Sequence, residues 1–287
     1  MTKVEVVYEG HALLGEGVNW DASQGVLFWI DIDAGHVFRL KPGGQPEQIE
    51  LGQKVGAVVP RRSGGLVLAV KEGFALMDRW GEPMRVVASP EKDKPRNRMN
   101  DGKCDSAGRF FAGTLSPEPK NARFYRFDPD GSVHTVLSDI TISNGLGWSP
   151  DNRTMYYIDT PTYRVEAFDY DAATGSLTRR RTLIEVPREH GGPDGMAVDE
   201  TGCLWVAHWN GNAVRRYTPK GALDRTIEVP TSLVTCCAFG GSDLSDLYIT
   251  TASAELEESR RREQPHAGDL FVVSPGVKGL PAFAFGG

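Results

Sequence analysis

The chain has 287 residues, a net charge of −6 and 40% hydrophobic residues. This apolar content is ample for a packed core and argues against intrinsic disorder. An acidic chain without a basic face is a poor partner for nucleic acid. The first residues lack the basic and apolar segments of a secretion signal, and no apolar run is long enough to cross a bilayer. We therefore expect a cytoplasmic protein without a nucleic-acid or membrane partner, as a monomer or a weak homo-oligomer.

A short apolar strand pattern recurs through the whole chain. The copies begin at Leu27, Leu66, Phe110, Met155, Leu204 and Leu247. Each follows a turn rich in Asp, Gly, Pro or Ser, and each precedes a second strand pattern, at residues 37–40, 75–78, 124–127, 165–170, 213–217 and 270–273. A repeat of about 40 to 50 residues is the length of a four-stranded propeller blade. The sequence therefore predicts an all-β, six-bladed β-propeller that forms one domain over residues 1–287.

Two segments lie outside the repeat. Residues 4–8 alternate apolar and polar side chains, and we expect them to supply the missing strand of the last blade and close the ring. The charged run from Glu255 to Glu263 lies between the two strands of the last copy. Such a run is usually a solvated face, here one or two helical turns, and the alternative is a flap over the mouth of the site. Two separate sandwiches are the rival fold, but the repeat continues through the midpoint without a linker.

A polar residue with a glycine one or two positions after it precedes several of the apolar strands by ten or eleven positions. These residues are Glu16, Asn100, Asn144 and Asp194. Equivalent positions on the innermost strands of a propeller surround one central channel, so the four side chains should converge. Carboxylates that face each other repel unless a cation lies between them, and an all-oxygen set suits a divalent ion. In the other two copies Gly56 and Cys237 stand near this register, and both are poor ligands for a hard ion.

The competing interpretation of these dipeptides is structural. Asn-Gly and Asp-Gly are strong hairpin-turn signals, and any one of them alone is more often a turn. Four copies in repeat register, all before the same strand, favour a shared centre. Asp31 and Asp159 end equivalent strands, and for them we expect turn or capping roles. His190, His208 and His266 are expected to be structural or exposed.

Six stretches of the chain resemble the SMP-30/gluconolactonase family, also called regucalcin-like lactonases. They are LGEGVNWD (14–21), RNRMNDGKCDSAGRFFAGTL (96–115), ISNGLGWSPDNRTMYYIDT (142–160), GGPDGMAVDETGCLWVAHW (191–209), VPTSLVTCCAFGGSDLSDLYITTA (229–252) and AGDLF (267–271). The resemblance implies a six-bladed propeller with one divalent metal ion, Ca²⁺, Zn²⁺, Mn²⁺ or Fe²⁺, held by Glu16, Asn144 and Asp194. It also implies that Arg98 and Asn100 bind a sugar lactone, which is hydrolysed to the aldonic acid. Glu118 or Asn121 could add a substrate contact where the chain departs from the family pattern.

Asp194 is the expected catalytic residue. It would take a proton from the attacking water and pass it to the ring oxygen, while Arg98 stabilises the oxyanion. A hydroxide on the metal is the competing nucleophile. Two other functions use the same ligands: a calcium-binding scaffold without catalysis, and a phosphotriesterase similar to diisopropyl fluorophosphatases. The presence of Arg98 and Asn100 beside the ligands favours the enzyme. The absence of a GxSxG motif argues against a serine esterase.

Overall fold

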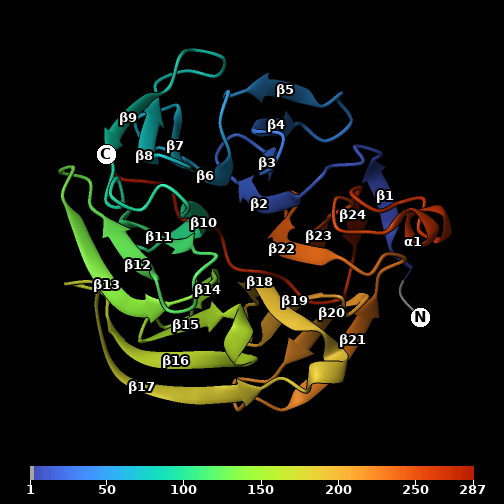
Figure 1. Ribbon diagram of the computed structural model, residues 1–287. Coiled ribbons are helices and arrows are strands. Elements are labelled where there is room, and N and C mark those ends of the chain that lie inside the picture. The colour runs from blue at the N-terminus through green and yellow to red at the C-terminus, as the bar shows by residue number, and fades with distance from the viewer. Residues whose placement is uncertain (1–2) are drawn as a thin grey trace.

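Six four-stranded antiparallel sheets make up the computed structural model, which describes residues 3–287. The sheets stand as blades around a central axis (Figure 1). The first three blades are β2 (Gly15–Asp21), β3 (Val26–Asp31), β4 (His36–Leu40) and β5 (Glu47–Glu50); β6 (Val55–Pro60), β7 (Leu66–Val70), β8 (Gly73–Met77) and β9 (Arg85–Ala88); and β10 (Arg98–Cys104), β11 (Phe110–Leu115), β12 (Ala122–Phe127) and β13 (Val133–Ile140). The expected all-β propeller of six blades is confirmed.

The remaining blades follow the same order from the axis outward. They are β14 (Ser143–Trp148), β15 (Thr154–Asp159), β16 (Arg164–Asp171) and β17 (Ser176–Glu185); β18 (Gly192–Val198), β19 (Leu204–Trp209), β20 (Ala213–Tyr217) and β21 (Leu223–Glu228); and β22 (Val234–Gly240), β23 (Asp246–Thr251), β24 (Leu270–Val273) and β1 (Glu5–Tyr8). Each predicted apolar strand is the second strand of its blade, and each predicted partner is the third.

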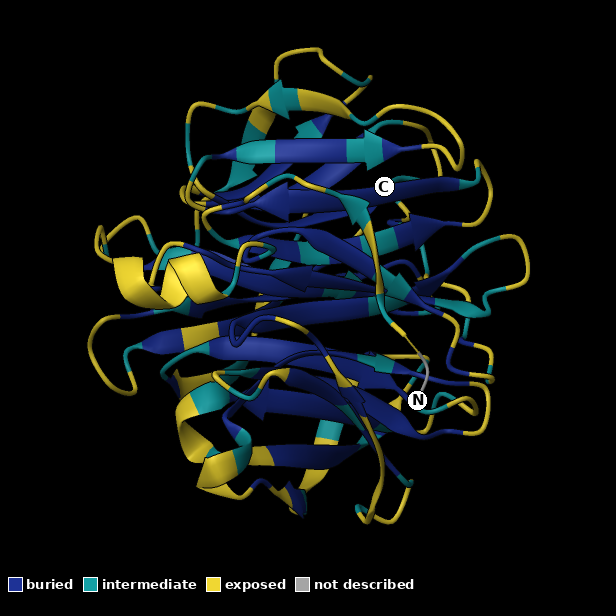
Figure 2. Cartoon of the chain, turned by 90° about the vertical axis from the view of Figure 1, so that its right-hand side faces the viewer, coloured by how far each residue is buried: buried dark blue, intermediate teal, exposed yellow. Residues whose placement is uncertain are grey.

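The two inner strands of each blade are mostly buried, and the outermost strand is the most exposed. Figure 2 shows buried strands through the body of the molecule and exposed segments at its edges. The second strands are almost wholly buried because apolar side chains on both faces pack against the two neighbouring blades, as in β7 and β19. The outermost strands, such as β5 and β21, are mostly exposed and polar. Their composition explains why the apolar pattern did not predict them.

The ring is closed by the two ends of the chain. β1 pairs antiparallel with β24, so the last blade contains three strands from the C-terminal part and one from the N-terminal part. Tyr8 packs near Trp29 and Phe38 of the first blade, with ring centroids 5.8 and 6.1 Å apart. This arrangement confirms the role expected for residues 4–8, and it covers the edge of β24 that would otherwise be exposed.

Within residues 3–287, helical structure is confined to three short segments. α1 (Glu258–Glu263) has no buried residue and projects from the molecule, which agrees with the solvated face expected for the charged run (Figure 2). The other two segments are the 3₁₀ turns η1 (Thr160–Thr162) and η2 (Arg188–His190). In the described part of the chain, no helix has the length and apolar character needed to span a membrane.

The C-terminal tail crosses the end of the central channel, a feature that the sequence did not predict. It pairs with Asp199 through Gly279, with Cys104 through Phe283 and with Arg61 through Phe285. Phe285 is buried and stacks on Phe127, with centroids 5.2 Å apart. Figure 1 shows the tail passing behind the middle of the ring from β24 to the C-terminus. The tail therefore links opposite sides of the propeller.

Candidate metal centre

The four polar residues singled out in the sequence all lie on innermost strands, near one end of the channel. Glu16 is in β2, Asn100 in β10, Asn144 in β14 and Asp194 in β18. Each is only 5–6% exposed. The pairing register shifts at or beside these positions, as it does in all six innermost strands. A bulge twists the strand and redirects a side chain, which is how the innermost strands of four blades can aim polar groups at the axis.

Glycine is needed beside the polar residues for two different reasons. Gly17 has a φ of +58°, a left-handed conformation that side chains with a Cβ rarely adopt. Gly145 packs so closely against the next blade that a Cβ would lie 2.4 Å from the carbonyl oxygen of Asp194. The glycines therefore shape the backbone and let adjacent blades approach at the crowded axis.

A chain of hydrogen bonds orients the amide side chains. Arg98 Nη1 donates to Asn100 Oδ1 at 2.5 Å. Asn100 Nδ2 donates to the carbonyl of Ser143 at 2.8 Å and to Asn144 Oδ1 at 3.3 Å. The amide oxygen of Asn100 thus points at Arg98, whereas the oxygen of Asn144 receives only one long hydrogen bond. Of the two amides, Asn144 offers the better oxygen for a metal ion.

Thr160 fixes the direction of Asn144. Its hydroxyl accepts a hydrogen bond from Asn144 Nδ2 at 2.9 Å and donates to the carbonyl of Pro193 at 2.8 Å. The amide nitrogen is thereby held away from the axis, which leaves Oδ1 facing it. No pattern in the sequence indicated a role for Thr160. Its position directly after Asp159, at the end of a strand, gave no distinguishing signal.

Two buried carboxyl groups dominate the electrostatics of the centre. Burial, together with the charge of Asp101, raises the pKa of Glu16 to about 8. Burial and the charges of Glu16 and Asp101 raise the pKa of Asp194 well above its usual range, against the opposing charge of Arg98. One oxygen of Asp194, Oδ1, is buried without a hydrogen-bond partner. Desolvated carboxyl groups of this kind are stabilised in their charged form by a nearby cation.

These observations fit a divalent ion. The unpartnered Asp194 Oδ1, the Glu16 carboxyl group and Asn144 Oδ1 form an oxygen donor set, which suits hard ions such as Ca²⁺, Mg²⁺ and Mn²⁺. Within residues 3–287, no three His, Cys, Asp or Glu side chains gather into a metal-binding group. The candidate set accordingly consists of two carboxylates and an amide.

Asp31 and Asp159 hold the loops that lead into the first and fourth blades. Asp31 accepts hydrogen bonds from the backbone of residues 13 and 14, at 2.8 and 3.1 Å, just before Glu16. Asp159 accepts from the backbone of Ile142 at 2.9 Å, just before Asn144. The capping roles expected for both residues agree with this geometry. Through these bonds they also place the entry to the strand that carries each candidate ligand.

In the last blade, the residue at the register of the polar residues is Thr235. Cys237, which the sequence placed near this register, lies two residues further along, because the register shift of β22 falls between Val234 and Cys236. Thr235 therefore occupies the bulge, and its buried hydroxyl hydrogen-bonds to the carbonyl of Gly15 and to Thr250. The pair of adjacent cysteines obscured this register, because the two residues are equally apolar.

The remaining candidates have local partners. Glu118 pairs with Arg96 at 3.1 Å and accepts a hydrogen bond from Asn121 Nδ2. Both Glu118 and Asn121 are on an exposed loop, so a substrate contact by either stays a prediction.

His208 is fully buried, and burial lowers its pKa to about 3, in line with a structural role. His266 Nδ1 lies 2.9 Å from Asp269 Oδ2. Asp101 is buried with Oδ2 unpartnered, next to Asn100 in the same bulge, and burial raises its pKa.

The fold and the centre together define a six-bladed β-propeller with a buried oxygen-donor site at one end of its channel. Comparison with known proteins makes the assignment specific: the SMP-30/Gluconolactonase/LRE-like region matches residues 14–253, and the chain belongs to this family. Regucalcin from Danio rerio is 41% identical over 292 residues, which cover 99% of both chains.

Two solved structures share the complete fold. A calcium-binding protein, regucalcin, from Agrobacterium tumefaciens superposes with a TM-score of 0.95 at 30% identity, covering 99% of this chain and 97% of that one. A luciferin-regenerating enzyme superposes with a TM-score of 0.92 at 30% identity and covers all of both chains. The likeness therefore extends from the first blade to the C-terminal tail.

Proposed function

We propose that the protein is a metal-dependent hydrolase that opens sugar lactones to aldonic acids. The observation that carries the proposal is the convergence of Glu16, Asn144 and Asp194 at one end of the channel, with an unpartnered oxygen on Asp194. Membership of a family whose description includes gluconolactonase supports the same reaction class. The substrate would be a five- or six-carbon aldonolactone.

Each residue around the centre can take a separate role in ester hydrolysis. A divalent ion held by Glu16, Asn144 and Asp194 would supply a Lewis acid for the lactone carbonyl. Asp194 would accept a proton from the attacking water and return it to the ring oxygen as the C–O bond breaks. Arg98 carries a positive charge within reach of both carboxyl groups and would stabilise the oxyanion. Asn100, held by Arg98, would hydrogen-bond a sugar hydroxyl.

Calcium binding without catalysis is the second candidate function. It is favoured by the printed name of the Agrobacterium relative, a calcium-binding protein, and by the oxygen donor set of this centre. Arg98 separates the two functions, because a site that only stores a cation gains nothing from a guanidinium group beside its ligands. A phosphotriesterase would use the same residues and differ in the groups that contact its substrate.

The test is lactone hydrolysis followed with a pH indicator. Protein stripped with a chelator is reloaded with Ca²⁺, Mn²⁺, Zn²⁺ or anaerobic Fe²⁺ and given pentono- and hexonolactones, with diisopropyl fluorophosphate as a separate substrate. We expect metal-dependent turnover that is lost in Glu16→Gln and Asp194→Asn, whereas Glu50→Gln, on the exposed outer strand β5, is the control that should keep it. Arg98→Met should lose turnover but keep the metal. Metal binding without turnover on any lactone would favour the calcium-binding scaffold instead.

A further inference from the structure

The other end of the channel contains a cavity of about 320 Å³ that the metal centre does not use. It is lined by the later residues of the innermost strands, including Trp20, Trp148 and Val198, and by Leu280 and Phe283 of the C-terminal tail. Val198 follows Asp194 by four residues on β18. At a rise of about 3.3 Å per residue, this places the cavity roughly 13 Å farther along the axis. The two sites are therefore separate.

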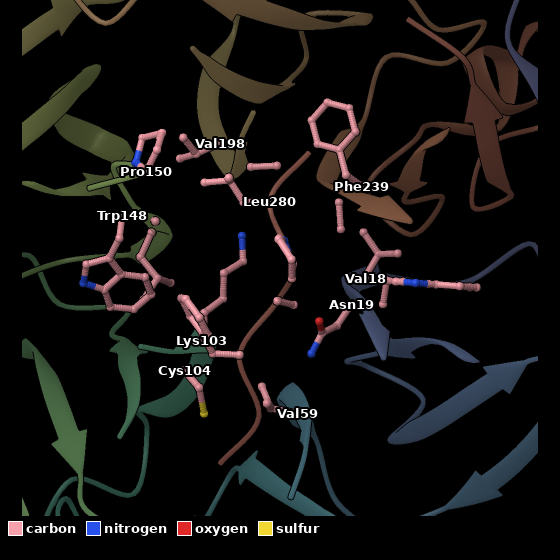
Figure 3. Close-up of a pocket in the computed structure, with 18 of the residues that line it drawn as sticks. Val18, Asn19, Val59, Lys103, Cys104, Trp148, Pro150, Val198, Phe239 and Leu280 are labelled. Carbon is pink, nitrogen blue, oxygen red and sulfur yellow. The ribbon is translucent and has the colours of Figure 1, made fainter. Parts of the chain in front are cut away.

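Most of the cavity wall is apolar, and a positive charge lies in its middle. Figure 3 shows the Lys103 side chain extended between Trp148, Leu280 and Val59. The Lys103 ammonium group donates a hydrogen bond to the carbonyl of Met196. In the part of the chain that the structure describes, it has no carboxylate partner at ion-pair distance. An ammonium group carries three N–H donors, so two remain for a ligand.

Asn19 adds a neutral donor on the opposite wall. Its Nδ2 donates one long hydrogen bond, at 3.4 Å, to the carbonyl of Val58, and the second N–H of the amide is free to donate into the cavity. Figure 3 shows the Asn19 amide facing the space that Lys103 enters. Two directed donors in an otherwise apolar pocket are the arrangement that orients a small amphipathic ligand.

The C-terminal tail forms one wall of the cavity rather than filling it. Gly279 is paired with Asp199 on one side, and Phe283 with Cys104 on the other. Pro281 and Ala282, between these two attachment points, are exposed and also line the cavity. A ligand could therefore enter beside this short unpaired stretch.

We propose that this cavity binds a small aromatic carboxylate, with the carboxylate on Lys103 and Asn19 and the ring between Trp20, Trp148 and Phe239. The charge selects an anion, because an ammonium group that has no carboxylate at ion-pair distance within residues 3–287 is stabilised by a carboxylate ligand in an apolar cavity. The aromatic walls select a flat apolar body, because aromatic pairs add to the energy of burial. A cavity of this volume matches the lower range of small-molecule sites, which begins at about 300 Å³.

Calorimetric titration of the full-length, chelator-treated protein tests the proposal. The probes are phenylacetate and its neutral isostere phenylacetamide. We expect one phenylacetate per chain, with at least about tenfold weaker binding in Lys103→Met, since charged hydrogen bonds are the stronger kind. Phenylacetamide should bind weakly and equally to both proteins. Asp194→Asn, at the other end of the channel, should retain phenylacetate binding and so exclude capture at the metal centre.

A second variant keeps the test decisive if Lys103→Met fails to fold. Ala282→Trp places a large side chain at the exposed entrance, where the fold imposes little constraint, and should abolish binding of both probes. Equal affinity for the acid and the amide, or unchanged phenylacetate binding in Lys103→Met or Ala282→Trp, would overturn the proposal. So would loss of phenylacetate binding in Asp194→Asn.

Discussion

Glu16 holds its proton far more tightly in the folded protein than in an unfolded chain. Burial raises its pKa from an ordinary 4.5 to about 8, with the charge of Asp101 adding to the rise. Above pH 4.5 the folded state therefore binds more protons than the unfolded state, so stability falls as pH increases toward 8. The pKa of Asp194 is raised as well. A bound cation would reverse this trend by favouring the charged carboxylates.

The first prediction concerns the metal-free protein between pH 5 and pH 8. Its free energy of unfolding should decrease over this range, with a contribution from Glu16 on the order of a few kcal/mol. Glu16→Gln should flatten the decrease, whereas Glu118→Gln, at an exposed carboxyl group, should leave it unchanged. Urea unfolding at a series of pH values measures the effect. If the free energy of unfolding of Glu16→Gln decreased with pH as steeply as that of the parent, the raised pKa would not belong to Glu16.

Thr160 gives a second prediction at the scale of one hydroxyl group. Thr160→Val keeps the shape of the side chain but removes the group that holds Asn144 Nδ2 away from the axis. We expect the affinity for a divalent ion to fall by about tenfold, as is typical when a residue that orients a ligand is lost. Calorimetric titration with Mn²⁺ measures the change.

Thr226→Val on the exposed strand β21 is the matched control for Thr160→Val and should bind Mn²⁺ as the parent does. An unchanged Mn²⁺ affinity in Thr160→Val would show that the hydrogen bond from Asn144 to Thr160 is not needed to orient Asn144. An equal loss in both variants would show that the effect does not come from the hydrogen bond to Asn144.

At the scale of elements, the two ends of the chain hold the ring together in different ways. β1 completes the last blade through a short ladder with β24, and Tyr8 extends this contact to the aromatic rings of the first blade. The tail joins blades across the channel through isolated bridges and the buried Phe285. The pairing of β1 with β24 therefore closes the ring of blades, and the C-terminal tail connects blades on opposite sides of the channel.

The third prediction tests the closure. Tyr8→Ala removes a half-buried ring that packs on Trp29 and Phe38, and it should lower the free energy of unfolding by about 1–2 kcal/mol. Val6→Ala, on the same strand but 37% exposed, should have a smaller effect. Denaturant melts of the two variants provide the comparison. If Val6→Ala were the more destabilising change, the contact between the first and last blades would not contribute as described.

At the scale of the whole molecule, the repeat in the sequence predicted the architecture because burial is periodic. The second strand of each blade is buried on both faces, so each copy of the repeat contains a recognisable run of apolar residues. The outer strands were not predicted because they face solvent and are mostly polar, so they lack an apolar pattern. The tail escaped because its contacts, such as that between Phe285 and Arg61, join residues far apart in the chain.

The repeat also made part of the candidate site predictable from the sequence. Glu16, Asn100, Asn144 and Asp194 shared a repeat position one or two residues before a glycine, and the structure brings them to one end of the channel. The role of Thr160 depends on the path of a hydrogen bond between two blades, which no local pattern encodes. The Lys103 cavity likewise exists only because the C-terminal tail crosses the channel.

The most direct test of the central claim is the position of a bound ion, measured by anomalous diffraction from crystals grown with Mn²⁺. We predict one strong peak at the axis, within about 2.2 Å of oxygens from Glu16, Asn144 and Asp194, oxygen ligation being what Mn²⁺ prefers. Crystals of Asp194→Asn grown in the same way should show a weakened peak or none. A strong peak elsewhere in the channel, with none between these three residues, would contradict the account.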